Sequence, residues 1–130
     1  MLAVEKQTET KKRILLVDDE IAILKLLEFI LKKDYELVIK NNGFDALTWL
    51  DSGNVPDLII SDMEMPYFDG AEFVRSLKVS GYFRDVPVIV LSGSETLENI
   101  KNKIPYQIND LIAKPFNPTI LKDKIKIILN

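Results

Sequence analysis

The chain alternates short, uninterrupted runs of Ile, Leu and Val with longer stretches in which apolar residues recur at helical spacing. The apolar runs cover residues 13–17, 58–61, 86–91 and 111–113. Runs of this length without polar alternation are typical of strands that are covered on both faces, as in a parallel sheet. The run at 35–39 contains Glu36, which predicts a more exposed strand at an edge of the sheet.

Each apolar run is followed by a stretch whose apolar residues share one helical face. These residues are Ile23, Leu27 and Ile30; Ala46 and Leu50; Phe73 and Leu77; Ile100 and Ile104; and Leu121, Ile125 and Ile128. Asn117 followed by Pro118 is typical of the N-cap and first turn of a helix. Gly43, Gly70 and Gly81 fall at predicted element boundaries.

Strict alternation of five strands with five helices indicates the α/β class, with helices on both faces of an open parallel sheet. We therefore expect a flavodoxin-like, doubly wound (βα)5 fold with a five-stranded parallel sheet in the order 2-1-3-4-5. The length of 130 residues fits one domain. We expect this domain to cover residues 13–130 and residues 1–12, which lack an apolar stretch, to form a flexible tail.

The amino-acid composition limits which side chains could carry out chemistry. The chain has no cysteine and no histidine, which excludes disulfides, thiol catalysis, histidine general bases and a Ser/His/Asp triad, and leaves carboxylates, hydroxyls, lysines or a hard cation. The net charge of -3 favours neither nucleic acid nor a membrane surface as a partner, and a Lys cluster late in the chain is interpreted as a solvated helix face. Without a secretory leader or an apolar run of about 20 residues, we expect a cytoplasmic protein.

Polar residues follow four of the predicted strands. They are Asp18, Asp19 and Glu20 after the first, Asp62 after the third, Ser92 and Gly93 after the fourth, and Lys114 and Pro115 after the fifth. The carboxyl ends of parallel strands form one crevice, and in the order 2-1-3-4-5 the first and third strands are neighbours about 4.8 Å apart. Asp19 and Asp62 are then expected to converge. Converging carboxylates repel one another unless a cation lies among them, and Mg²⁺ fits best.

A lysine and a hydroxyl opposite such a cation suit phosphoryl transfer, which needs positioning and charge neutralisation. Taken singly, each residue also has an ordinary structural explanation, as a helix cap, a loop residue or a solvated strand end. Their joint appearance at four strand ends favours the functional interpretation.

The order and spacing of four motifs resemble the receiver domain of bacterial two-component response regulators. The motifs are Val17-Asp18-Asp19-Glu20, residues 57–66 with Asp69-Gly70, Val90-Leu91-Ser92-Gly93, and Lys114-Pro115-Phe116. The resemblance spans residues 13–129. It implies a signalling phospho-acceptor, not an enzyme acting on other substrates, that receives a phosphoryl group from a phosphohistidine on a sensor histidine kinase or a histidine phosphotransfer protein.

The resemblance also implies roles for individual residues. Asp62 is the phospho-acceptor, Ser92 hydrogen-bonds the phosphoryl group and Lys114 pairs with it. Mg²⁺ is bound by Asp19, by Asp62 and by the backbone carbonyl of Glu64, with Asp18 acting through water. The Lys114–Pro115 peptide bond is expected to be cis.

Output is expected through the face formed by the fourth helix, the fifth strand and the fifth helix, which contacts a downstream protein. Many receivers carry an aromatic residue three positions before the strand-end lysine, and this chain has Leu111 there. A change in apolar packing, smaller than an aromatic switch, is then expected.

Several alternatives stay open from the sequence. One is a receiver fold that acts as an interaction module without phosphorylation, and another is the receiver part of a longer regulator with an output domain beyond residue 130. A flavin binder of the same fold is disfavoured because the acids at Asp18–Glu20 would repel a phosphate. A hydrolase with an aspartyl-phosphate intermediate normally has a second acid two positions after its nucleophile, where this chain has Glu64, but it would also need a cap domain.

Overall fold

The computed structural model describes residues 11–65, 68–93, 97–104 and 108–130. Along the chain the elements are β1 (Arg13–Val17), α1 (Ile21–Leu31), β2 (Glu36–Lys40), α2 (Gly43–Asp51), β3 (Leu58–Asp62), α3 (Gly70–Val79), β4 (Val88–Ser92), α4 (Leu97–Lys103), β5 (Asp110–Ala113) and α5 (Pro118–Leu129). The five strands are parallel and lie in the order β2-β1-β3-β4-β5. This is the predicted flavodoxin-like arrangement, with the strand that contains Glu36 at an edge.

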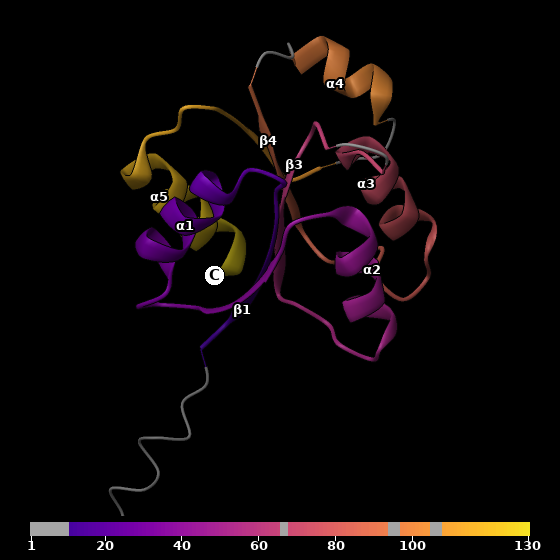
Figure 1. Cartoon of the computed structure of the whole chain (residues 1–130), viewed down its shortest axis with the longest axis horizontal. Helices are drawn as coiled ribbons and strands as arrows, with labels where there is room; N and C mark the ends of the chain where they lie inside the picture. The colour runs from indigo at the N-terminus through magenta and orange to yellow at the C-terminus, as the bar shows by residue number, and fades with distance from the viewer. Residues whose placement is uncertain (1–10, 66–67, 94–96, 105–107) are drawn as a thin grey trace, which may run out of the picture.

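The sheet lies between two helical layers, as Figure 1 shows. Helices α1 and α5 cover one face, and α2, α3 and α4 lie on the other. The 1–10 part of the predicted tail lies outside the described residues. Among the described residues no helix combines the length and the apolar character that crossing a bilayer requires.

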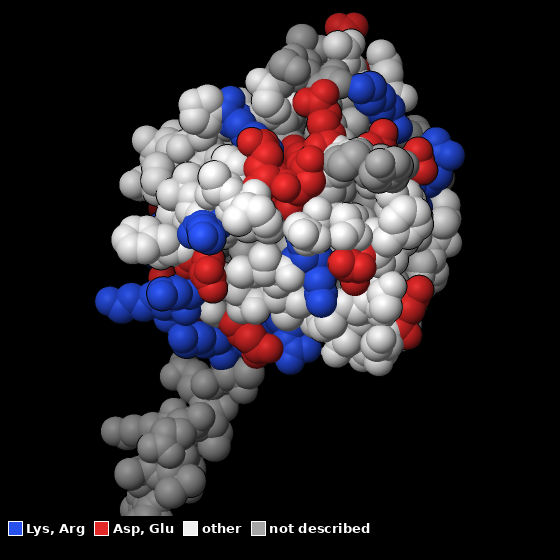
Figure 2. Space-filling view, in the orientation of Figure 1, with Lys and Arg blue, Asp and Glu red and all other residues white. Residues whose placement is uncertain are grey.

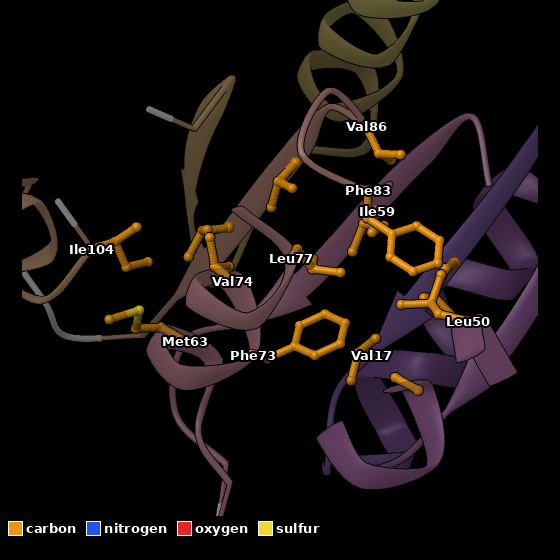
Figure 3. Packing of buried hydrophobic residues seen from close by; sticks show 14 of the residues in the cluster. Val17, Leu50, Ile59, Met63, Phe73, Val74, Leu77, Phe83, Val86 and Ile104 are labelled. Atoms are coloured by element: carbon orange, nitrogen blue, oxygen red, sulfur yellow. The ribbon is translucent and has the colours of Figure 1, made fainter. Parts of the chain in front are cut away.

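Alternate residues of the strands point to opposite faces of the sheet and belong to two separate hydrophobic cores. Leu15, Val17 and Ile59 point to the side of α2, α3 and α4, where they pack with Phe73 and Leu77 (Figure 3). Their strand neighbours, which include Ile14, Leu16, Leu58 and Ile60, pack under α1 and α5. Because both faces of the central strands are covered, their sequences are apolar without alternation, as the sequence pattern required.

Several strand boundaries differ from the prediction by one or two residues. The fourth strand begins at Val88, not at residue 86, and Pro87 precedes it. Proline has no N–H to donate to a ladder, although its carbonyl still accepts from Ile59 at 3.0 Å. The third and fourth strands extend through Asp62 and Ser92, so these polar residues belong to the sheet itself.

The residues predicted to mark helix starts at Asn117, Pro118 and Gly70 lie where the sequence placed them. The Asn117 side chain accepts hydrogen bonds from the backbone N–H groups of Thr119 and Ile120, and Pro118 opens α5. Gly70 begins α3 where a Cβ would lie 2.1 Å from the backbone oxygen of Asp62. Only glycine fits there, and its N–H donates to the carbonyl of Met63.

Candidate functional site

The strand alternation directs three charged side chains to the same crevice. Asp62 follows Leu58 and Ile60 on the face of the sheet toward α1 and α5. Asp18 continues β1 in the same phase after Ile14 and Leu16, and Lys114 does so in β5 after Ile112. Acidic side chains gather at this end of the molecule, between the two helical layers (Figure 2).

Lys114 is the centre of the site. Its Nζ lies 2.9 Å from Oε1 of Glu20, 3.0 Å from Oδ2 of Asp18 and 3.1 Å from Oδ1 of Asp62. The contact with Glu20 has hydrogen-bond geometry, whereas the contacts with the two aspartates are ion pairs by distance. The Lys114–Pro115 peptide bond that follows is cis, as the resemblance implied.

Asp18 is fully buried and only partly satisfied. Its Oδ1 accepts a hydrogen bond from the backbone N–H of Glu20 at 2.9 Å. Its Oδ2 accepts none, and within the described part of the chain it is the one buried side-chain polar atom in that condition. An orphaned carboxylate oxygen at this depth is costly unless a further cation or donor approaches it.

Burial and charge raise the pKa values of both buried acids. Burial raises the pKa of Asp62 to about 6, the negative charge of Asp18 adds to the effect, and Lys114 opposes it. The pKa of Asp18 is raised mainly by burial, against the hydrogen bond from Glu20 and the charge of Lys114. Burial by itself lowers the pKa of Lys114, but the hydrogen bond to Glu20 and the neighbouring aspartates outweigh it and raise the pKa.

The other predicted site residues lie around this group. Ser92 ends β4 and is buried, and the N–H of Lys114 donates to its carbonyl at 2.8 Å. Asp19 and Glu64 are exposed. The group of carboxylates whose oxygens lie within 4.8 Å of one another consists of Asp18, Glu20 and Asp62, so Asp19 is not part of it. Metal binding by Asp19 and by the Glu64 carbonyl stays a prediction.

Two contacts in the structure are not evident from the sequence. The first is Glu20, which was noted at the strand end without a role and turns out to contact Lys114, 94 residues away. The second is a stack of Phe44 on Phe68, with ring centroids 5.0 Å apart, at the start of α2. A Cβ on Gly43 would lie 2.5 Å from the Phe68 ring, so a glycine is needed where this ring packs.

The arrangement suits a divalent cation. Three carboxylates face one ammonium group, which leaves an excess of negative charge, and one buried carboxylate oxygen lacks a hydrogen bond. Oxygen ligands of this kind are those that Mg²⁺ prefers. The donor set therefore fits the metal that the sequence predicted.

Comparisons with known proteins agree with one another. The family model described as "Response regulator receiver domain" matches residues 14–126. The transcriptional regulatory protein FlgR of Helicobacter pylori is 38% identical over 87% of this chain, which spans 28% of FlgR. The chemotaxis protein CheY1 of the same species is 26% identical over 90% of this chain, which spans 96% of CheY1.

Solved structures show the same likeness. The signal receiver domain of a signal transduction histidine kinase from Syntrophus aciditrophicus superposes with a TM-score of 0.82 at 33% identity, covering 91% of this chain and 89% of that one. The chemotaxis response regulator CheY4 of Vibrio cholerae gives a TM-score of 0.81 at 28% identity, covering 92% and 100%. With this fold, this crevice and these relatives, the chain belongs to the response regulator receiver domain family and is a receiver of two-component signalling.

Proposed function

We propose that Asp62 is the residue that accepts the phosphoryl group, from a phosphohistidine on a sensor histidine kinase or a histidine phosphotransfer protein. A carboxylate oxygen of Asp62 forms the new O–P bond as the N–P bond to the partner's imidazole breaks. The observation that carries the proposal is the 3.1 Å contact between the buried Asp62 carboxylate and Lys114, in the crevice shared with Asp18. A lysine there is close enough to neutralise charge on an arriving phosphoryl oxygen.

We propose that Mg²⁺ is bound by Asp19, Asp62 and the backbone carbonyl of Glu64, with Asp18 acting through water. When bound, the cation supplies charge neutralisation for the phosphoryl oxygens. The support is the excess of negative charge in the crevice, where carboxylate oxygens of Asp18, Glu20 and Asp62 lie within 4.8 Å of one another and Oδ2 of Asp18 accepts no hydrogen bond. Asp19 lies outside that group and is proposed as a ligand from the resemblance alone. Ser92 is proposed to donate a hydrogen bond from its hydroxyl to a phosphoryl oxygen, because it is buried at the end of β4 beside Lys114.

Intact-mass measurement tests the acceptor. Acetyl phosphate with Mg²⁺ should add one phosphoryl group to the wild-type chain, and Asp62→Asn should abolish the gain. A variant that gains the same mass at another residue contradicts the assignment. No gain in the wild-type chain, with beryllofluoride also failing to bind at Asp62, favours an interaction module that works without phosphorylation.

We propose that the signal leaves through the face formed by α4, β5 and α5, which contacts a downstream protein. Leu111 of β5 packs partly buried against the core beneath α4, which contains Ile100 and Ile104. A small movement of Ser92 at the end of β4 is therefore expected to change apolar packing at Leu111. Residues 94–96 of the loop expected to move with Ser92 lie outside the described residues.

Backbone amide NMR shifts with and without beryllofluoride test this output face. Changes at residues 97–104 and at Leu111 are expected, and they should be smaller than in receivers with an aromatic residue at that position. Changes confined to residues that touch the phosphoryl mimic would contradict this choice of face.

A further inference from the structure

Glu20 makes a contact that its position in the helix does not explain. It is the N-cap residue of α1, with extended backbone, but its side chain accepts no capping hydrogen bond from the helix. Its carboxylate instead accepts a hydrogen bond from Lys114 at 2.9 Å. The Glu20 side chain is 59% exposed, whereas that of Lys114 is only 11% exposed. An exposed acid thus contacts a nearly buried lysine from the solvent side.

Glu20 shares the ammonium group of Lys114 with the two buried acids. Asp18 and Asp62 lie 3.0 and 3.1 Å from the ammonium nitrogen, about as close as Glu20 at 2.9 Å. The ammonium group has three N–H donors, so these three acids can occupy all of them. Glu20 is the exposed member of the three, whereas Asp18 and Asp62 are buried.

We propose that Glu20 is a positioning residue that holds Lys114 toward solvent and competes with the phosphoryl group for its ammonium. This inference rests on the proposed roles of Asp62 as acceptor and of Lys114 as the partner of the phosphoryl oxygens. With three carboxylates on its three N–H donors, Lys114 can pair with a phosphoryl oxygen only by giving up one of these contacts, and the exposed Glu20 is the acid whose contact water can replace. Exposed ion pairs of this kind change an equilibrium by a factor of about 1.5 to 5. Glu20 is thus expected to slow phosphorylation by a factor in that range.

Glu20 has two other possible effects, and the test separates them from the contact. Its negative charge at the mouth of the site repels anionic phosphodonors whether or not it touches Lys114. Its carboxylate also lies in one group with Asp18 and Asp62, where it would act on the metal. The variant Glu20→Asp distinguishes these effects because it keeps the charge but is shorter by one methylene. Lys114 cannot follow the shortened side chain, since it is paired with two buried aspartates.

The experiment measures the rate of phosphorylation by acetyl phosphate at saturating Mg²⁺ for the wild type, Glu20→Gln, Glu20→Asp and Glu28→Gln. The last is a matched control, an exposed glutamate on the same helix. We expect Glu20→Gln and Glu20→Asp to be faster than the wild type by about 1.5- to 5-fold, and Glu28→Gln to be unchanged. In metal-free protein, the NMR signal of the Lys114 ammonium group should change in both Glu20 variants and not in Glu28→Gln.

The outcomes are separable. Acceleration of Glu20→Gln alone would show a charge effect and overturn the proposal, as would unchanged rates in both variants. A loss of Mg²⁺ affinity of more than tenfold in Glu20→Gln, with no gain in rate at saturating metal, would make Glu20 a metal ligand and also overturn it. A wild-type chain that is not phosphorylated on Asp62 would refute the proposed acceptor. A phosphorylated wild type with Glu20→Asp at the same rate would refute only the role of Glu20.

Discussion

Replacing the proposed acceptor should make the metal-free protein more stable at neutral pH. Asp62 is 4% exposed, and burial and the charge of Asp18 raise its pKa from 3.8 to about 6. The folded chain therefore holds a proton between these pH values that the unfolded chain releases. The stabilisation from this proton is fully present below pH 3.8 and is lost as the pH rises through about 6. Asn at position 62 cannot ionise and avoids that loss.

The size of the effect follows from the two pKa values. At about 1.36 kcal/mol per pKa unit, ionised Asp62 costs the folded protein about 3 kcal/mol at pH 7 and only about 1 kcal/mol at pH 4.5. Asp62→Asn should therefore raise the free energy of unfolding by about 3 kcal/mol at neutral pH and by about a third of that in acid. With a urea dependence of about 2 kcal/mol per molar, the unfolding midpoint should rise by about 1.5 M at pH 7.

Urea unfolding in EDTA, followed by the fluorescence of Trp49, measures this difference. Trp49 is the single tryptophan of the chain, and the guanidinium of Arg13 lies 6.0 Å from its ring centre. The control is Asp123→Asn, which removes the same charge from an exposed position in α5. Equal midpoints for Asp62→Asn and the wild type at pH 7 would refute the reasoning. A gap of the same size at pH 4.5 and pH 7 would show a packing effect instead of titration. Adding Mg²⁺ should narrow the gap, because the cation stabilises the wild-type carboxylate.

Three further changes test other parts of the structure. Asn117→Ala removes the cap of α5 and should lower the free energy of unfolding by about 1 kcal/mol in urea unfolding, with Asn117→Ser largely restoring it. Gly70→Ala places a Cβ against the backbone at Asp62 and should destabilise by about 1–3 kcal/mol or more; an unchanged midpoint would contradict the contact. We also hypothesise that the exposed Glu64 carboxylate, two positions from the acceptor, either orients or repels the hydrolytic water. Glu64→Ala should then change the lifetime of the phosphorylated form, measured as decay of the added mass, and equal decay rates would dismiss this role.

Most of the fold was predictable because it depends on local patterns. Strands covered on both faces need uninterrupted apolar runs, and helices on a sheet need apolar residues at helical spacing. Both patterns can be seen directly in the sequence. The cap at Asn117 and Pro118 was equally readable, since it meets a local backbone requirement. Gly43 and Gly70 were placed at element boundaries from the sequence, but the reason for each glycine is the close approach of Phe68 or of the backbone at Asp62, which only folding creates. The strand boundary before Val88 was missed by two residues because apolar character continues through Val86, while the ladder begins only after Pro87.

The sequence predicted which strand ends form the site, but not which side chains there contact one another. The sequence by itself determined that Asp62, Ser92 and Lys114 lie at the carboxyl ends of parallel strands, and a parallel sheet brings such ends to one edge. It did not determine which two of the three consecutive acids, Asp18 to Glu20, approach the lysine. Tertiary structure decided that, because the Glu20 N–H donates to Asp18 where the chain turns into α1, which leaves Glu20 beside Lys114 and Asp19 outside the group. The raised pKa of Asp62 was likewise decided by folding, since burial and the approach of Asp18 exist only once distant strands are packed side by side.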